Sequence, residues 1–255
     1  MTSKHVIAVT GVNKTYPLGR IRVRALSDVD LTIGRGELIA LAGPSGSGKT
    51  TLLNLIGCID KPDDGRIVVD DVDVTRVPLH RLSTLRRDTL GFIFQTFNLI
   101  PVLTAYENVE YPLLLQNLPR RERETRVRHW LREVGLEQQA KQRPDQLSGG
   151  QRQRVAIARA MVTEPKLVLA DEPTANLDSE TAARILDLLG EINSRTRCTF
   201  VFSTHDPSLI ARAERVVRIR DGRIESGQQT ADSGQQVRVE AAVRRPLSAV
   251  QETYA

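Results

Sequence analysis

The sequence predicts an α/β protein with a mostly parallel sheet core, and three observations support this fold class. Short apolar runs that resemble buried strands alternate with helical patterns along the second half of the chain. A glycine-rich loop, residues 43–50 (GPSGSGKT), stands between an apolar run and a helix-forming segment. The first 33 residues show the partly alternating pattern typical of antiparallel strands, which predicts a separate β subdomain at the N-terminus.

The predicted strands follow one another along the chain. Antiparallel strands are expected at residues 5–9 and 21–33. The run 37–42 (ELIALA) predicts a strand that leads into the glycine-rich loop, and residues 51–56 continue as a helix. Further buried strands are predicted at residues 67–69, 90–94, 167–170, 199–203 and 216–219. Because helical patterns separate the later ones, we expect a parallel sheet that is covered on both faces.

The middle of the chain predicts an inserted helical subdomain at about residues 96–163. Within it, Thr104 and Glu107 form a capping box before an apolar run, so a helix should begin near Ala105. From Ser226 onward the sequence loses aromatic and large aliphatic residues. We therefore expect one folded domain over residues 1–227 and a polar, flexible tail over residues 228–255.

Composition argues against several classes of protein. No apolar stretch approaches the ~18 residues needed to span a bilayer, and MTSKHVIAVT lacks the apolar run of a secretory signal, which predicts a cytoplasmic protein. Cys58 and Cys198 have no metal-ligand spacing and are expected to be buried, reduced thiols. The net charge of +5 comes largely from residues 120–132. Val127 and Leu131 recur there at helical spacing, so the arginines cover a solvated helix face or, alternatively, contact a partner or lipid.

The loop GPSGSGKT meets the full spacing of a phosphate-binding loop. Its backbone N–H groups can surround phosphates, Lys49 can reach the β- and γ-phosphates, and the Thr50 hydroxyl can ligate Mg²⁺. A glycine-rich turn that merely starts a helix would not need Lys and Thr in register. The predicted nucleotide-binding residues of this segment are Gly43, Pro44, Ser45, Gly46, Ser47, Gly48, Lys49, Thr50 and Thr51.

Two adjacent carboxylates follow a predicted strand in KLVLADEP, residues 166–173. Pro173 prevents the strand from continuing, so Asp171 and Glu172 should lie at its end. Asp171 can hold the Mg²⁺ shell, while Glu172 can orient or deprotonate an attacking water, as hydrolysis requires. The alternative is that two acids simply end a buried strand at the surface.

A second candidate anion site lies in QLSGGQRQRVAIARA, residues 146–160. This predicted helix opens on Ser-Gly-Gly instead of a side chain able to fill the space before its first turn. A helix N-terminus carries unpaired N–H groups and about half a positive charge, and glycines let a ligand approach the backbone. Ser148, Gly149, Gly150 and Gln151 are therefore candidates for contact with a phosphate.

LSGGQ at residues 147–151, the phosphate loop before it and the Asp-Glu pair after it together resemble the ATP-binding cassette (ABC) family of ATPases, over about residues 4–227. The resemblance implies a P-loop NTPase fold of ABC type that binds ATP and Mg²⁺ and hydrolyses ATP to ADP and phosphate. In that family the Ser-Gly-Gly helix start caps the γ-phosphate held by a second subunit, so a head-to-tail dimer encloses two ATPs. Each anion site would then be half of a composite pocket.

The same resemblance implies roles for two further residues before the helical subdomain. Tyr16, in NKTYPLG, is similar to the aromatic residue that stacks on adenine; a packed edge residue is the alternative. Gln95, which ends GFIFQ, resembles the glutamine that reaches Mg²⁺ and the attacking water and moves with the helical subdomain. An ordinary polar strand end is the alternative for Gln95.

Two more residues match family positions after the acid pair. His205, in STHD, resembles the switch histidine that contacts the γ-phosphate. Asp178, in ANLD, matches an aspartate that crosses the dimer interface, and it could also cap a helix that begins at Ser179. Many family members have Ser-Ala before Leu-Asp, whereas this chain has Ala175 and Asn176, which leaves the details of coupling between the two sites open.

An ABC ATPase without membrane segments implies partners. We expect a homodimer of the ATPase, an integral membrane permease on a separate chain, and a peripheral position on the cytoplasmic face of the inner (plasma) membrane. Residues 96–115, TFNLIPVLTAYENVEYPLLL, resemble the branch of lipoprotein-releasing, macrolide-exporter-like and cell-division ATPases. In that branch ATP drives a mechanical signal across the membrane.

Three alternatives to this branch remain open or are disfavoured by the sequence. An ATPase subunit of an amino-acid-type importer shares many of these features. A soluble ABC protein acting on nucleic acid or ribosomes would carry a long coiled coil or a second cassette, and the sequence has neither, so no direct nucleic-acid binding is expected. A catalytically silent scaffold would not need Lys49, Asp171, Glu172 and His205 together.

Overall fold

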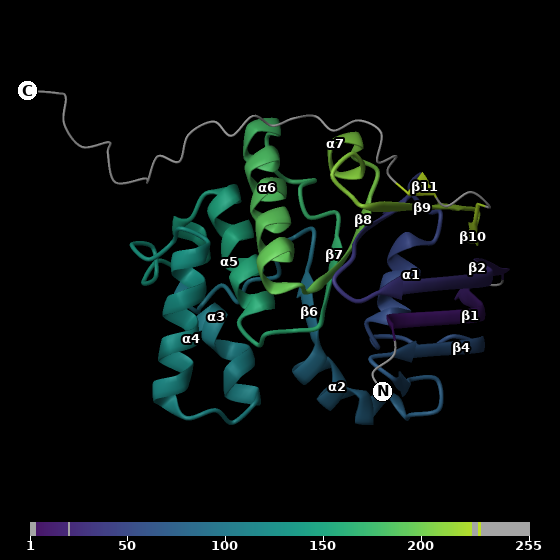
Figure 1. The fold of residues 1–255 in the computed structure, drawn as a ribbon, viewed down its shortest axis with the longest axis horizontal. Coiled ribbons are helices and arrows are strands. Elements are labelled where there is room, and N and C mark those ends of the chain that lie inside the picture. The colour runs from purple at the N-terminus through teal and green to yellow at the C-terminus, as the bar shows by residue number, and fades with distance from the viewer. Residues whose placement is uncertain (1–3, 20, 226–228, 231–255) are drawn as a thin grey trace, which may run out of the picture.

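The computed structural model describes residues 4–19, 21–225 and 229–230, and its strands form two sheets (Figure 1). The N-terminal sheet is antiparallel and has the strand order β2-β1-β4-β5. Its strands are β1 (His5–Leu18), β2 (Ile21–Gly34), β4 (Asp64–Val69) and β5 (Val72–Asp73). The predicted strand at residues 67–69 therefore belongs to the N-terminal sheet.

The second sheet is parallel through β6-β7-β8-β3-β9. Its strands are β3 (Leu38–Ala42), β6 (Leu90–Ile93), β7 (Leu167–Asp171), β8 (Thr199–Thr204) and β9 (Arg215–Arg220). Two short antiparallel strands, β10 (Arg223–Ile224) and β11 (Gln229–Thr230), pair with β9. The predicted fold class is confirmed.

The helices lie between the sheets and around the parallel sheet (Figure 1). α1 (Lys49–Ile56) contacts strands of both sheets. Residues 96–163 contain no strand, only helices and their connections. The remaining helices are η1 (Leu79–Arg81), α2 (Leu82–Thr89), α3 (Ala105–Leu115), α4 (Arg120–Glu133), η2 (Pro144–Gln146), α5 (Gly149–Met161), α6 (Ser179–Thr196) and α7 (Pro207–Ile210).

Two local predictions in the helical segment agree with the structure. α3 begins at Ala105, and its capping box is present: Glu107 N donates to Thr104 Oγ1 at 3.2 Å, and Thr104 N donates to Glu107 Oε2 at 2.8 Å. α4 buries Val127 and Leu131, while arginines of its exposed face pair with glutamates. No helix in the described part of the chain is long and apolar enough to cross a membrane.

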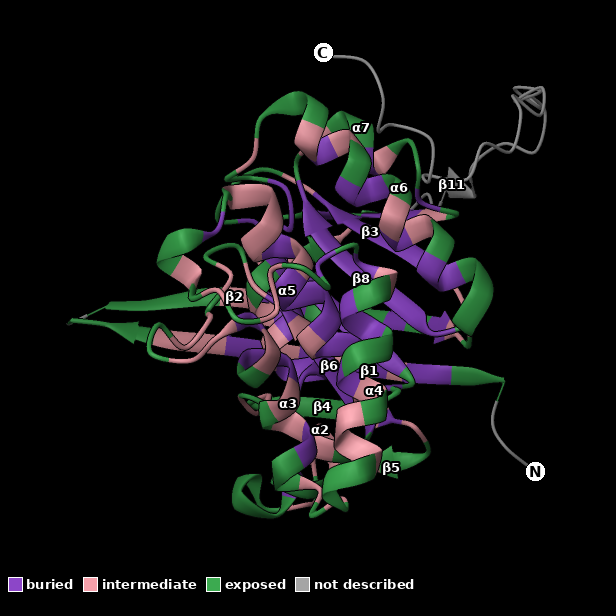
Figure 2. Ribbon diagram, turned by 90° about the vertical axis from the view of Figure 1, so that its left-hand side faces the viewer, coloured by how far each residue is buried: buried purple, intermediate pink, exposed green. Residues whose placement is uncertain are grey.

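The parallel strands alternate between two hydrophobic cores. Phe200 and Phe202 of β8 face the core built with α3, α4, α5 and α6, whereas Val201 faces the core shared with α1 and the antiparallel sheet. The strands are accordingly buried along most of their length (Figure 2). This period-two pattern confirms the prediction of a sheet covered on both faces.

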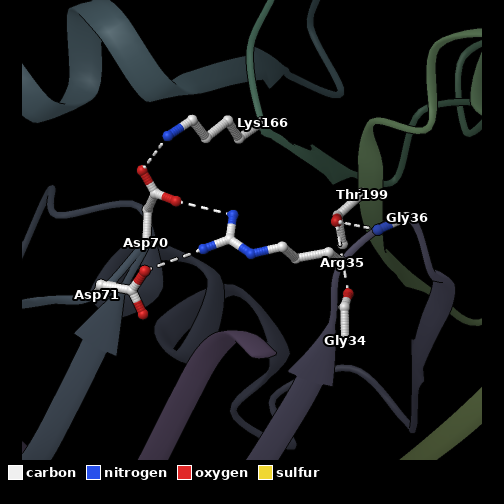
Figure 3. A network of polar contacts seen from close by, with 7 residues as sticks. All are labelled: Gly34, Arg35, Gly36, Asp70, Asp71, Lys166 and Thr199. Atoms are coloured by element: carbon white, nitrogen blue, oxygen red, sulfur yellow. Dashed lines mark hydrogen bonds and ion pairs between the residues drawn. The ribbon is translucent and has the colours of Figure 1, made fainter. Parts of the chain in front are cut away.

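A polar network joins the two sheets through the segments that flank their strands (Figure 3). Asp70, between β4 and β5, accepts hydrogen bonds from Arg35 Nη1 at 2.8 Å and from Lys166 Nζ at 2.6 Å. Arg35 follows β2 and Lys166 precedes β7, so one carboxylate connects three segments. Burial alone would raise the pKa of Asp70, but the bonds from Lys166 and Arg35 outweigh it and lower that pKa.

Two further predictions concern cysteines and the tail. Cys58 and Cys198 are buried free thiols, as predicted, and burial raises their pKa values to about 11 and about 12. In the segment predicted as a flexible tail, Gln229–Thr230 pairs with β9. The rest of that prediction, over residues 228 and 231–255, lies outside the described residues.

Candidate nucleotide-binding site

A pocket of about 380 Å³ lies at the carboxyl ends of β3, β7 and β8 and at the start of α1. Ligands of open α/β sheets commonly bind at this edge. The pocket unites residues that the sequence spreads over nearly two hundred positions. It is lined by Val23, Arg24, Ala25, Ser45, Gly46, Gly48, Lys49, Thr50, Thr51, Gln95, Asp171, Glu172 and His205.

The loop before α1 needs glycine for steric reasons. Gly46 and Gly48 have φ angles of 78° and 106°, a conformation that residues with a Cβ atom rarely adopt. A Cβ on Gly48 would lie 2.6 Å from the Ala25 carbonyl oxygen, and one on Gly43 would lie 2.1 Å from the Ile219 carbonyl oxygen. The glycines therefore let the loop pass closely over β2 and β9.

The start of α1 has no side-chain cap. Its N-cap, Gly48, makes no side-chain hydrogen bond, and the first turn contains no acidic residue. Lys49 is 6% exposed, and its Nζ donates to the carbonyl oxygens of Gly43 at 2.8 Å and Pro44 at 2.9 Å. Unpaired N–H groups and a fixed ammonium at one helix start make a strong site for an anion.

Hard oxygen ligands meet beside this helix start. The Thr50 hydroxyl lies 3.2 and 3.1 Å from the two carboxylate oxygens of Asp171, which ends β7. Gln95, just beyond β6, lines the same pocket. No group of three His, Cys, Asp or Glu side chains with metal-binding geometry occurs among the described residues. Hydroxyl, carboxylate and amide oxygens suit Mg²⁺, which usually takes its other ligands from water and phosphate.

Glu172 and His205 meet at the mouth of the pocket. His205 Nδ1 lies 2.8 Å from Glu172 Oε1. Glu172 has a φ of 47°, and its N–H donates to the Ser203 carbonyl oxygen at 2.9 Å, which ties it to β8. The Glu172 side chain is 16% exposed and the His205 side chain is 71% exposed. A sheltered carboxylate therefore adjoins an accessible imidazole.

Asn176 makes a contact that the sequence did not predict. Its Nδ2 donates to the Gln95 carbonyl oxygen at 2.8 Å, although the two residues are 81 positions apart. The sequence marked Asn176 only as a departure from a family pattern. Its spacing carried no signal of this partner, because the contact depends on how the loops after β6 and β7 lie in space.

The start of α5 differs from its prediction. The sequence predicted a helix start without a filling side chain, and this is wrong. Gln151 N donates to Ser148 Oγ at 3.2 Å, and Ser148 N donates to Gln151 Oε1 at 2.8 Å. Serine at the N-cap and glutamine three residues later make a reciprocal capping box.

Within one chain the α5 start and the pocket are separate features. Ser148, Gly149, Gly150 and Gln151 do not line the pocket. Gly149 instead lies beside the loop between β7 and α6: a Cβ on it would be 3.5 Å from Leu177 Cδ2. Asp178 caps α6 by accepting from Thr181 N at 2.9 Å, in agreement with the helix-cap alternative.

Tyr16 lies at the rim of the pocket and does not line it. Its strand partner in the β1–β2 register is Val23, which does line the pocket. The Tyr16 hydroxyl donates to Asp60 Oδ2 at 2.7 Å. Burial and this bond raise the pKa of Tyr16 to about 12. No sequence motif predicts this partner, because Asp60 lies 44 positions from Tyr16.

A second hollow, a groove of about 410 Å³, lies between α2, β6, α3 and α5. Its walls combine apolar and basic side chains, among them Phe92, Leu115 and Arg87. Arg159 of α5 reaches across it and donates to the carbonyl oxygens of Phe97, at 2.7 Å, and Asn98. The groove thus borders the loop that follows Gln95.

Comparison with known proteins agrees with this geometry. The ABC transporter family model matches residues 26–175. The chain is 47% identical over 219 residues to the lipoprotein-releasing system ATP-binding protein LolD of Anaeromyxobacter dehalogenans, which covers 86% of this chain and 92% of that protein. It is 46% identical over 229 residues to the macrolide export ATP-binding/permease protein MacB 1/2 of Paracoccus denitrificans, of which this chain spans only 34%.

A solved structure is similar over nearly the whole described fold. The ATP-binding cassette MJ0796 of Methanocaldococcus jannaschii, in a dimeric post-hydrolysis state bound to ADP and Pi, has a TM-score of 0.81 at 43% identity and covers 88% of this chain and 98% of that one. The family model, the relatives and the fold agree with one another, and the chain belongs to the ABC transporter family as an ATP-binding ABC ATPase.

Proposed function

We propose that this ABC ATPase works as a homodimer that encloses two ATPs and drives a separate membrane permease of the lipoprotein-release, macrolide-export or mechanotransmission type. The observation that carries the proposal is the meeting, in one pocket, of the uncapped α1 start, the Thr50–Asp171 pair and the Glu172–His205 pair. Phosphate binding, metal binding and water activation each have their residue types there.

The phosphate chain of ATP would lie over the loop before α1. Backbone N–H groups of that loop and of the α1 start would donate to phosphate oxygens, and Thr51 would contact the α-phosphate. Lys49 then exchanges its bonds to two loop carbonyls for the β- and γ-phosphates. Its ammonium is already held at the loop, so little side-chain entropy is lost on binding.

Hydrolysis would use the residues at the ends of β6, β7 and β8. Thr50, Asp171 and Gln95 would hold Mg²⁺, which when bound neutralises charge on the phosphates. Glu172 accepts a proton from the water that attacks the γ-phosphorus, the bond to the β-phosphate oxygen breaks, and ADP and phosphate form. His205, held against Glu172, contacts the γ-phosphate from the exposed side of the pocket.

The proposed dimer supplies what one chain lacks. Ser148, Gly149, Gly150 and Gln151 lie outside the chain's own pocket, which supports a role for them at the γ-phosphate of a second copy. Asp178, just after Leu177, would lie at the same interface. The relative MJ0796 has been solved as a dimer.

The permease would dock in the groove between α2, β6, α3 and α5. The groove combines apolar and basic side chains, and α3 leaves Tyr111, Leu114 and Leu115 exposed by 43%, 44% and 53% beside it. Exposed apolar side chains gathered beside a groove favour a protein partner. Relatives named LolD and MacB support the transport branch, and such a partner would hold the ATPase at the cytoplasmic face of the inner membrane.

One experiment tests hydrolysis and dimerisation together. We expect Glu172→Gln to lower kcat by roughly a hundredfold or more while leaving ATP affinity intact, because the amide cannot accept the proton. We also expect this variant to form dimers on size-exclusion chromatography with ATP and Mg²⁺ but not with ADP. Equal ATPase rates in the wild type and the variant, or a variant that stays monomeric at saturating ATP, would contradict the proposal.

A second experiment tests the docking groove. Leu115→Asp places a charge in the groove, whereas Val102→Asp changes a residue that is 70% exposed and does not line it. We expect only Leu115→Asp to reduce recovery of the ATPase with membranes of its source cell, while both variants bind ATP as the wild type does. Equal recovery of both variants would argue against this groove.

A further inference from the structure

A charged cluster lies beside the rim residue Tyr16, outside the pocket itself. Its centre is Asp60, on the loop after α1. Asp60 accepts from the Tyr16 hydroxyl at 2.7 Å, from Lys14 Nζ at 3.0 Å and from the Lys61 N–H at 2.7 Å. Lys14 Nζ also lies 5.0 Å from the centroid of the Tyr16 ring. The Asp60 carboxylate thus binds both the hydroxyl of the Tyr16 ring and the Lys14 ammonium near that ring.

Lys14 is unusually buried for a lysine. It is 8% exposed, and its Nζ donates to the Lys61 carbonyl oxygen at 2.6 Å as well as to Asp60. A lysine is rarely buried this far unless its charge is paired, so the ion pair with Asp60 holds the ammonium in place. The cluster is therefore a fixed structure and not a set of mobile surface charges.

The charges of the cluster fix the direction of the Tyr16 hydrogen bond. Burial alone would raise the pKa of Asp60, but the bonds from Lys14, Tyr16 and the Lys61 N–H outweigh it and lower that pKa. Burial and Asp60 raise the pKa of Tyr16 to about 12. Near neutral pH the hydroxyl is therefore a donor and the carboxylate an acceptor, which makes a strong, charge-assisted bond.

The Tyr16 side chain faces the nucleotide pocket. Tyr16 and Val23 are directly paired across β1 and β2, so their side chains lie on the same face of the sheet, and Val23 lines the pocket. The side chain of Thr51, another lining residue, also acts on the Tyr16 hydroxyl and partly offsets the rise in its pKa. The ring is thus held between the pocket wall and Asp60.

We infer that Asp60 is a positioning residue for the base of bound ATP: by accepting the Tyr16 hydroxyl and holding Lys14, it fixes the ring in the orientation that the adenine meets. The inference rests on the proposed function, because it takes Tyr16 as the residue that contacts the base. Asp60 touches no phosphate-binding residue. It therefore acts on the affinity for the base and not on the hydrolytic step.

To test this inference, the Kd for ATP is measured in the presence of Mg²⁺. The proteins are the wild type, Tyr16→Phe, Asp60→Asn and the double variant. Tyr16→Phe keeps the ring and the Lys14–Asp60 pair, and it removes only the hydroxyl, with its bond to Asp60 and its interaction with Thr51. We expect each single variant to raise the Kd for ATP by roughly three- to tenfold, the range for a hydrogen bond to a charged group. The double variant should bind no more weakly than the weaker single variant, because both changes remove one interaction.

Two readouts separate positioning from a general structural effect. Inorganic tripolyphosphate has no base, so its Kd should be the same in all variants. In a spectroscopic pH titration of the four tyrosines, Asp60→Asn should move one ionisation down from about 12. Asp64→Asn is the matched control: its carboxylate accepts from Gly65 N at 2.8 Å and is not part of the Lys14–Tyr16–Asp60 cluster, so it should leave the Kd for ATP unchanged.

The inference is overturned if Tyr16→Phe binds ATP as tightly as the wild type, if the two changes are additive, or if tripolyphosphate binding weakens to the same extent as ATP binding. If Asp60→Asn does not fold, the Kd values of Tyr16→Phe for ATP and for tripolyphosphate test the inference by themselves. A wild-type protein that binds no ATP would overturn the proposed function itself, and the inference with it.

Discussion

The starts of α1 and α5 are both rich in glycine and serine, yet they are built in opposite ways. The α1 start has no side-chain cap and opens into the pocket beside Lys49. The α5 start is closed by its own side chains, Ser148 and Gln151. A capping box satisfies the N–H groups of the N-cap and of the third helical residue, so those of Gly149 and Gly150 remain without an intrahelical partner. An anion at α5 would therefore meet the two glycines and not the serine and glutamine backbone.

This difference shows what each start can do alone. α1 combines its free N–H groups with its own Lys49 ammonium and Thr50 hydroxyl and with the Asp171 carboxylate at the end of β7, so one chain brings phosphate- and metal-binding groups together there. The α5 start offers the N–H groups of Gly149 and Gly150 and is closed by its capping box. It does not line the pocket that holds Lys49 and Asp171. In the proposed dimer, a second molecule would bring the anion to it.

The largest effect is expected from removing the ammonium at α1. Lys49→Ala should lower kcat/KM for ATP by roughly a hundredfold or more, because a buried, preorganised charge is lost from the phosphates. Steady-state ATPase assays measure it. Lys141→Ala, an exposed lysine in the helical segment, is the control and should behave as the wild type does. If Lys49→Ala had normal activity, the α1 start would not depend on its ammonium, and the contrast with α5 would not hold.

Next in size is the contrast between two glycine substitutions. Gly48→Ala should destabilise the fold by about 3 kcal/mol, because its Cβ would meet the Ala25 carbonyl oxygen at 2.6 Å and its φ is 106°. Gly149→Ala meets only an ordinary contact at 3.5 Å, so its urea midpoint should match that of the wild type.

Gly149→Ala should nonetheless slow turnover, because its methyl group would obstruct an anion brought by a second copy. Normal turnover in this variant would show that nothing approaches Gly149 closely. Equal loss of stability in the two glycine variants would contradict the contrast between the two helix starts.

A smaller effect is expected from the cap of α5. Ser148→Ala should reduce the free energy of unfolding by about 1 kcal/mol, the usual range for a lost N-cap, as measured by urea denaturation. Gln151→Glu keeps a capping box but adds a negative charge at the helix start. It should fold normally and weaken ATP-dependent dimerisation of the Glu172→Gln protein by charge repulsion. If dimerisation is unaffected, the α5 start does not face a phosphate.

The smallest effect concerns pH and the matching box of α3. Hydrogen bonds from the backbone and side chain of Thr104 lower the pKa of Glu107, whereas Gln151 in the α5 box has no charge to lose. A carboxyl whose pKa is lowered by folding stabilises the folded state above its unfolded value, 4.5, and loses this contribution as pH falls through its folded value. Amide hydrogen exchange at the α3 start should therefore speed up in acid before that at the α5 start. Parallel changes at both helices would contradict this expectation.

The sequence predicted the parts of this fold that depend on local pattern. The order of strands, the start of α3 at Ala105 and the buried cysteines follow from periodicity, capping residues and composition. The prediction for the α5 start was wrong because Ser148 and Gln151 have the spacing of a capping box, as Thr104 and Glu107 do, and this box closes the helix start despite the glycines between them.

Contacts between distant segments were out of reach. The bonds from Asn176 to Gln95 and from Tyr16 to Asp60 join residues 81 and 44 positions apart, and neither pair has a spacing that predicts it. The phosphate loop and the acid pair could be assigned because each is a contiguous motif on a strand end. Their meeting at Thr50 and Asp171 follows from the parallel sheet, which brings the carboxyl ends of its strands together.

The hydrogen bonds from Arg159 to the loop after Gln95 have a mechanical consequence. Arg159 lies in the last turn of α5, whose 13 residues make a rod of roughly 20 Å. One end of the rod would face the neighbouring molecule, and the other holds Phe97 and Asn98 beside the groove. A stiff rod cannot tilt at one end and stay still at the other. Closure around nucleotide would therefore reach the permease as displacement, without any change in the fold of either end.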